Sequence, residues 1–202
     1  MTEPSDVELA RRLGSRDRAE RDAAFATLFE RHRQKAFDLA WRVLGDSGLA
    51  ADAVQEAFLT VYRRGARFEA RAQFSSWLYR VVLNQSIDLR RREKRTRTAP
   101  LFDGAVVGAH STADPDAREH PASPWPSPQA DASQAEQARI VQQAIARLSP
   151  KLAAVVVLRY PQGMAYEEIG EILGLPPGTV RSRLNRAHAA LREILGERLD
   201  ER

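Results

Sequence analysis

A proline-rich segment over residues 98–132 limits what this 202-residue chain can fold into. It holds six of the eleven prolines and many Ala, Ser and Asp residues, and Arg118 is its only basic residue. Proline fixes φ and removes a backbone donor, and neither a strand nor a helix period is visible there. We therefore predict a flexible acidic linker over 98–132 between two domains, 1–97 and 133–202.

On both sides of this linker, apolar residues recur at helical spacing. Before it we predict a short helix behind a Ser5–Glu8 capping box, a long helix ending at Gly45, and helices over 47–64 and 77–94, the last with Ser75 or Ser76 as N-cap. After it we predict a helix behind a Ser133–Glu136 capping box, one beginning at Ser149-Pro150, and helices over about 165–173 and 177–195. No segment reads as a strand, so we expect an all-α fold of two small helical domains.

The composition excludes several classes of site. The chain has no cysteine, which rules out disulfides, thiolate metal sites and a catalytic thiol. Its four histidines are too scattered for a zinc site. The N-terminus lacks the apolar core of a signal peptide, and no run of about 18 apolar residues could span a membrane. We expect a cytoplasmic protein with no membrane insertion, metal or cofactor.

The C-terminal helix pair is the strongest functional signal. A short helix, a turn at Gly174-Leu175-Pro176 and a longer amphipathic helix form a helix-turn-helix pattern. Between Pro176 and Arg192 there are four Arg and no acidic residue. Arg suits guanine, Asn suits adenine, and Ser and Thr suit phosphate, so we predict a helix that reads the major groove. The candidate residues are Thr179, Arg181, Ser182, Arg183, Asn185 and Arg186. A structural hairpin with a solvated basic face is the alternative.

Helix 77–94 combines aromatic and basic residues. Its first half is apolar and aromatic, and its second half and exit are basic. Aromatic rings beside a cationic track are typical of single-stranded nucleic-acid binding, because bases stack and phosphates pair. Taken alone, the pattern fits an ordinary core with a solvated Arg run better than it fits nucleic-acid binding.

The outer side of helix 47–64 is acidic, with Asp46, Asp52, Gln55 and Glu56. An acidic docking surface or a plain solvated face explains this pattern better than catalysis.

These segments resemble a known family. Residues 25–97 resemble the second conserved region of bacterial sigma factors, above all DAVQEAFLTVY (52–62) and FSSWLYRVVLNQSIDLRRR (74–92). Residues 146–195 resemble the fourth region, through ARLSP, YEEIG and PPGTVRSRL. Two such domains with no third region between them resemble the extracytoplasmic-function (ECF) group.

The resemblance implies a non-enzymatic initiation subunit that binds core RNA polymerase and directs promoter-specific transcription. It implies polymerase docking through Asp52, Gln55, Glu56 and Phe58. It implies recognition of the −35 element as duplex DNA through the six residues named above. It implies recognition of the −10 element as a melted single strand through the loop 67–74 and Phe68, Phe74, Trp77, Arg80, Asn84, Asp88 and Arg91. An anti-sigma factor is a further partner that this group commonly has.

Two positions depart from the family pattern. Ala165 stands where a Ser or Thr usually caps the helix, and the weaker cap is expected to cost about 1 kcal/mol. Gly170 stands mid-helix where Ala is usual, which is expected to cost up to about 1 kcal/mol more. Two other functions remain open from sequence. A stand-alone helix-turn-helix regulator would bind duplex DNA tightly without polymerase, and a metal-dependent nuclease using Asp46, Asp52 and Glu56 would cleave DNA with Mg²⁺.

Overall fold

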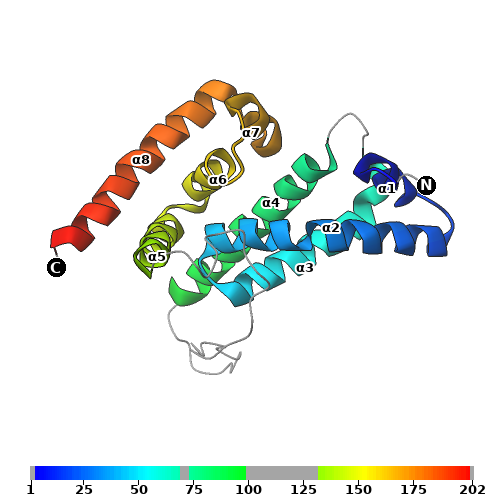
Figure 1. The fold of residues 1–202 in the computed structure, drawn as a ribbon, viewed down its shortest axis with the longest axis horizontal. Coiled ribbons are helices and arrows are strands. Elements are labelled where there is room, and N and C mark those ends of the chain that lie inside the picture. The colour runs from blue at the N-terminus through cyan, green and yellow to red at the C-terminus, as the bar shows by residue number, and fades with distance from the viewer. Residues whose placement is uncertain (1–2, 69–72, 99–131, 201–202) are drawn as a thin grey trace.

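The computed structural model describes residues 3–68, 73–98 and 132–200. Within these ranges the regular elements are all helical, which confirms the predicted all-α class (Figure 1). The predicted linker, apart from Thr98 and Ala132 at its ends, falls outside the described residues.

The first domain is a bundle whose helix ends follow from local sequence. Its elements are α1 (Asp6–Arg12), α2 (Arg18–Leu44), α3 (Ser47–Arg64), the 3₁₀ turn η1 (Gly65–Arg67) and α4 (Phe74–Thr98). The predicted capping box is present before α1: the Glu8 amide donates to Ser5 Oγ (3.3 Å), and the Ser5 amide donates to Glu8 Oε2 (2.7 Å). Gly45 ends α2 in the left-handed region at φ 74°, as predicted. The Asp46 carboxylate accepts from the Leu49 amide (2.8 Å) and begins α3.

Helix α4 begins at Phe74, three residues earlier than predicted. The Trp77 amide donates to the Gln73 carbonyl (3.2 Å), which closes the first turn. Ser75 and Ser76 therefore lie inside that turn, and neither is the N-cap. The physical reason is that the Phe74 side chain is only 1% exposed, so its burial anchors a turn that the capping pattern alone does not predict.

The second domain also follows the predicted element order. Its helices are α5 (Ala132–Arg147), α6 (Pro150–Arg159), α7 (Tyr166–Leu173) and α8 (Pro177–Asp200). Ser149 and Pro150 occupy the N-cap and first position of α6, although the Ser149 side chain makes no capping bond. The side chain of Ser133 lies outside the described residues, so the second capping box stays a prediction.

The N-terminus of α7 has one of the two hydrogen bonds of a capping box. Ala165 has no side-chain acceptor, but its amide donates to Glu168 Oε2 (2.7 Å). Gly170 was expected only to weaken this helix, and that expectation is corrected. A Cβ at Gly170 would lie 2.6 Å from the Leu175 carbonyl oxygen, so the turn after α7 leaves no room for Ala.

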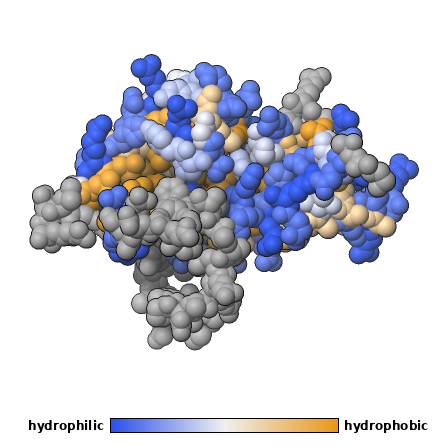
Figure 2. All heavy atoms as spheres, in the orientation of Figure 1, coloured by the Kyte–Doolittle hydropathy of each residue, from blue (hydrophilic) through white to orange (hydrophobic). Residues whose placement is uncertain are grey.

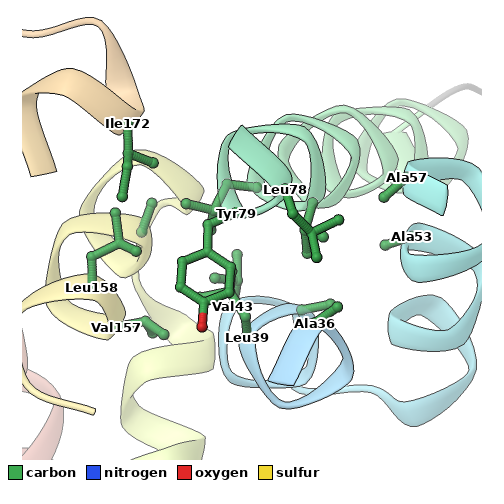
Figure 3. Packing of buried hydrophobic residues seen from close by; sticks show 14 of the residues in the cluster. Ala36, Leu39, Val43, Ala53, Ala57, Leu78, Tyr79, Val157, Leu158 and Ile172 are labelled. Atoms are coloured by element: carbon green, nitrogen blue, oxygen red, sulfur yellow. The ribbon is translucent and has the colours of Figure 1, made fainter. Parts of the chain in front are cut away.

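The two domains share one continuous core. Buried apolar side chains from α2, α3 and α4 meet those of α6 and α7 in a single cluster. In the close-up, Tyr79 projects from α4 toward Val157 and Leu158 of α6, with Val43 of α2 close by (Figure 3). Burial of a large apolar side chain contributes about 1.5–3 kcal/mol, so these contacts stabilise the packing of the two domains against each other.

Candidate nucleic-acid interface

One face of α8 presents the predicted duplex-reading residues to solvent. Arg181, Ser182, Asn185 and Arg186 are exposed, and Thr179 and Arg183 are half-buried at the edges. The opposite face carries the anchoring residues Val180, Leu184 and Ala187, which are each at most 2% exposed. The predicted division of α8 into a buried stripe and a basic face is thus present in the structure.

The turn between α7 and α8 fixes the direction of this basic face. Gly174 adopts a left-handed conformation at φ 65° and ends α7. The Leu175 amide then donates to the Gly170 carbonyl (2.8 Å), and the Thr179 amide donates to the Pro176 carbonyl (2.8 Å) to open α8. These bonds define a tight helix-turn-helix, in which α8 packs against α7.

On the face of α4 that is predicted to bind a single strand, some side chains are exposed to solvent and one is hydrogen-bonded to the second domain. Asn84, Asp88 and Arg91 are exposed, and Arg91 Nη1 lies 3.6 Å from Asp88 Oδ1. Arg80 differs, because its guanidinium Nε donates to the Ile172 carbonyl at the end of α7 (2.8 Å) and its Nη2 donates to the Glu171 carbonyl. The structure therefore brings Arg80 into contact with the second domain.

The three predicted aromatic residues form a cluster at the start of α4. The Phe68 and Trp77 ring centroids lie 5.4 Å apart, and both rings are half-buried. Phe74 is 1% exposed and lies beneath them, with its centroid 6.0 Å from that of Phe68. Phe74 thus supports the surface from below, while Phe68 and Trp77 reach it. Residues 69–72 of the predicted loop lie outside the described residues.

The outer face of α3 is acidic and lies beside an apolar groove. Asp52, Gln55 and Glu56 are exposed, as the sequence predicts, whereas Phe58 is 2% exposed. A groove of about 450 Å³ between α2 and α3 has Phe58 and Gln55 in its lining, together with Phe25, Phe29, Phe37 and Leu59. Phe58 therefore shapes the floor of this groove beneath the acidic face. The Asp46 carboxylate is used as the α3 cap, away from any shared site with Asp52.

Sequence reasoning missed the residues that join the two domains. Tyr79, Arg90 and Gln142 each contact the other domain through a side-chain hydrogen bond. Arg90 stands in a run of three arginines with nothing to distinguish it, and Gln142 lies about 100 positions from its partners. A single sequence carries no signal for such contacts.

In the described part of the chain, no three His, Asp or Glu side chains come together as a possible metal site. None of the helices in those ranges is both long and apolar enough to cross a bilayer. Figure 2 shows a largely hydrophilic face, with apolar atoms gathered toward the end where α5 and α8 lie.

Comparison with known proteins identifies the family. The model of Sigma-70 region 2 matches residues 28–96, and that of Sigma-70, region 4 matches residues 138–191. The ECF RNA polymerase sigma factor SigW of Bacillus subtilis is 31% identical over 94% of this chain and 98% of its own length. SigM of Mycobacterium tuberculosis, another ECF sigma factor, is 36% identical over 96% of this chain and 86% of its own. The chain belongs to the ECF RNA polymerase sigma factors.

Solved structures agree with this assignment. The structure of CnrH in complex with the cytosolic domain of CnrY matches this sigma factor with a TM-score of 0.61 and 26% identity, over 96% of this chain and 99% of CnrH. As a sigma factor, the chain serves promoter-specific initiation by RNA polymerase, and the family is not known for enzymatic activity. The region 2 model covers α3 and α4 up to residue 96, and the region 4 model covers the helix-turn-helix.

Proposed function

We propose that this ECF sigma factor reads its promoter in two different ways while it is held on core RNA polymerase. The basic face of α8 reads the −35 element as duplex, and the outer face of α4 binds the −10 element as a melted strand. The observation that carries the proposal is the solvent-exposed, acid-free face of α8 at the end of a helix-turn-helix.

The chemistry of α8 supports duplex recognition. Arg181 and Arg186 are exposed on adjacent turns, and a guanidinium can bond guanine O6 and N7 together. Asn185 is the residue type that pairs with adenine in the same way. Ser182 is placed to contact phosphate, although its hydroxyl donates to the Thr179 carbonyl (3.0 Å) in the free chain. These contacts combine phosphate positioning with base recognition.

The chemistry of α4 supports single-strand binding. Phe68 and Trp77 have half-buried rings at the start of α4, and Asn84 and Arg91 are exposed further along this helix. Unstacked bases need ring or apolar contacts to offset the free energy of unstacking, and an amide can bond a base edge. Phe74 holds the ring cluster in place from the core. Asp88 and Arg80 complete the proposed −10 surface.

The acidic face of α3 is the proposed contact with core RNA polymerase. Asp52, Gln55 and Glu56 are exposed there, and Phe58 shapes the neighbouring groove. Complementary charge steers association and sets orientation more than it adds affinity. We also propose that the protein acts in the cytoplasm and that an anti-sigma factor regulates it. A structural neighbour, RpoE of Bartonella quintana, was co-crystallised with the anti-sigma factor NepR.

Run-off transcription on fragmented genomic DNA from the source organism tests this function. Core polymerase with this protein should produce discrete transcripts that are absent with either component alone, and their start sites should share two upstream elements. Absence of transcripts, together with sequence-specific duplex binding without polymerase, would instead establish a stand-alone regulator. A control with the same polymerase and its principal sigma factor shows that the polymerase is active.

A further inference from the structure

The aromatic cluster at the start of α4 is built from two separate elements. Phe68 directly follows η1, whereas Phe74 and Trp77 lie in the first turn of α4. The relative placement of the Phe68 and Trp77 rings therefore depends on how η1 and that first turn are each held in place. The N-terminal helix α1 is linked to both of them.

The carboxyl end of α1 packs directly against η1. A Cβ on Gly65, the first residue of η1, would overlap the side chain of Leu13, which is the C-cap of α1 and is 2% exposed. A Cβ on Gly14 would lie 3.3 Å from the Ala66 Cα. The Phe68 amide donates to the Gly65 carbonyl (3.0 Å), so a displacement of η1 also displaces Phe68.

The amino end of α1 reaches the start of α4 through His32 of α2. His32 Nε2 lies 2.7 Å from Asp6 Oδ2, and the His32 ring centroid lies 5.1 Å from that of Phe74. A carboxylate only accepts hydrogen bonds, so Nε2 carries the hydrogen. Arg31 Nη1 donates to the other carboxylate oxygen of Asp6 (3.0 Å), which orients the carboxylate toward His32.

The His32 ring occupies the core although one of its nitrogens has no partner. The residue is 7% exposed, and Nδ1 is buried without a hydrogen bond to any residue that the structure describes. An unsatisfied buried polar atom is destabilising, and an apolar side chain of similar size would avoid that penalty. The imidazole supplies what an apolar side chain could not, a hydrogen bond from Asp6 to a ring that packs on Phe74.

We propose that α1 is a positioning element for the −10 surface, acting on Phe68 through Leu13 and on Phe74 through the Asp6–His32 pair. The inference rests on the proposed function of that surface. Contacts with unstacked bases offset the free energy of unstacking only when the rings are correctly placed, because dispersion contacts weaken steeply with distance. Asp6, Leu13 and His32 act through the rings and are not themselves proposed to contact DNA.

Ordinary core packing is the alternative explanation of these contacts. It predicts that their loss lowers the stability of the first domain and has no further effect. A smaller folded fraction reduces transcription from every template by the same factor, so the ratio between two templates does not change. Misplaced rings would instead change the ratio between templates that differ in the −10 element.

The first test variant is Asp6→Ala, which removes the acceptor of His32. Its matched control is Glu3→Ala, because Glu3 is exposed and pairs with the same Arg31 (3.1 Å) as Asp6 does. Both substitutions remove one carboxylate beside α1, but only Asp6→Ala breaks the link to Phe74.

The second test variant is Leu13→Ala, which removes the contact with η1. Leu39→Ala is its control, because it deletes the same atoms from a fully buried leucine of the same domain, about two turns beyond His32 on α2. Leu39 lies in the part of the core drawn in Figure 3, together with Val43. Leu13→Val, a smaller deletion, takes the place of Leu13→Ala if thermal unfolding shows that the latter is not folded.

Two measurements are made on each variant. Hydrogen exchange in the free protein is followed at the Phe68 amide and at the Trp77 amide, which donates to the Gln73 carbonyl (3.2 Å). Run-off transcription with core RNA polymerase compares a cognate promoter with promoters that carry one −10 or one −35 substitution.

We expect Leu13→Ala to accelerate exchange of the Phe68 amide, and Asp6→Ala that of the Trp77 amide, by about tenfold or more relative to the controls. Both should lower the transcript ratio between cognate and −10-substituted promoters by about threefold or more, because small misplacements of contact groups carry large penalties. The ratio for −35 substitutions should stay at the wild-type value. Glu3→Ala and Leu39→Ala should keep both ratios.

Unchanged exchange in both test variants would overturn the proposal. Faster exchange with wild-type −10 ratios would overturn it too, as would an equal fall in the −35 ratio or the same −10 loss in the controls. Failure of the proposed function has a different result: wild type gives no specific transcripts, or transcribes −10-substituted promoters as well as the cognate one. The exchange data need no polymerase, so they still show whether α1 holds the rings in place.

Discussion

Asp6 and His32 join α1 to α2 through a contact in which Oδ2 and Nε2 lie 2.7 Å apart. Arg31, next to His32, donates to Asp6 Oδ1 (3.0 Å) and to the Pro4 carbonyl (2.9 Å). His32 is 7% exposed, and its ring centroid lies 5.1 Å from that of Phe74. Through His32, the N-terminal helix α1 is thus linked to Phe74, the buried residue that anchors the start of α4.

This contact predicts a pH-dependent stability. Burial alone raises the pKa of Asp6, but the hydrogen bonds and charges of Arg31 and His32 together lower it below its usual value. A carboxyl with a lowered pKa in the folded state stabilises the protein above its unfolded pKa of about 4 and loses that contribution as the pH falls. Asp6→Asn should therefore cost about 1–2 kcal/mol at pH 6 by urea unfolding, and the cost should shrink below about pH 4. A difference that is constant from pH 6 to pH 3 would contradict this assignment.

Gly170→Ala should destabilise the second domain although Ala has the higher helix propensity. The new Cβ would meet the Leu175 carbonyl at 2.6 Å, so we expect a loss of about 1–3 kcal/mol in thermal or urea unfolding. Gly196→Ala is the control, because a Cβ at Gly196 of α8 meets nothing within 4 Å and should stabilise by about 0.5–1 kcal/mol. If the two substitutions changed the free energy of unfolding equally, helix propensity alone would determine the effect, and the contact with the Leu175 carbonyl would not matter.

Arg181→Ala or Arg186→Ala should reduce discrimination at the −35 element. Loss of a guanidinium bound to a base edge is expected to cost about 1–3 kcal/mol and to relax the preference at that base pair. Transcription from promoters with single −35 substitutions measures this, with −10 substitutions as the control. Unchanged −35 preference in both variants would argue that α8 does not read bases.

Asn84→Ala should affect promoter melting more than duplex recognition. Asn84 is exposed on α4, apart from the second-domain contact of Arg80, so its loss removes a proposed base contact without opening the domains. We expect weaker open-complex formation, measured by permanganate reactivity of melted thymines, with similar −35 dependence. A template whose −10 element is already unpaired removes the melting step. If Asn84 binds the displaced strand, Asn84→Ala should still bind this template more weakly than wild type.

Local patterns predicted the helices well because each end depends on neighbouring residues. The Ser5–Glu8 box, the Gly45 stop and the Ser149-Pro150 start all rely on contacts within one turn. The start of α4 was missed because burial of Phe74, a tertiary effect, extends the helix past the expected serine caps. Gly170 was misread for a similar reason, since the oxygen that excludes a Cβ belongs to Leu175 in the next turn of chain.

The candidate sites were predictable to the extent that amphipathic spacing determines exposure. On α8 the spacing separates Arg186 from Leu184 correctly, because one side of the helix packs on the core. Spacing alone could not show that Phe58 and Phe74 are covered by other helices, or that Arg80 bonds α7. These facts depend on how helices far apart in sequence meet.

The hydrogen bonds between the two domains depend on the side chain of the donor but not on the side chain of the acceptor residue. Arg80, Arg90 and Gln142 donate to backbone carbonyls at the ends of α7, α5 and α2, and those acceptors exist whatever side chains occupy the positions. Substitutions at Ile172, Ala146 or Trp41 therefore leave the acceptor atoms in place. Evolution can strengthen or weaken the association by single changes on the donor side, without needing a compensating change in the opposite domain.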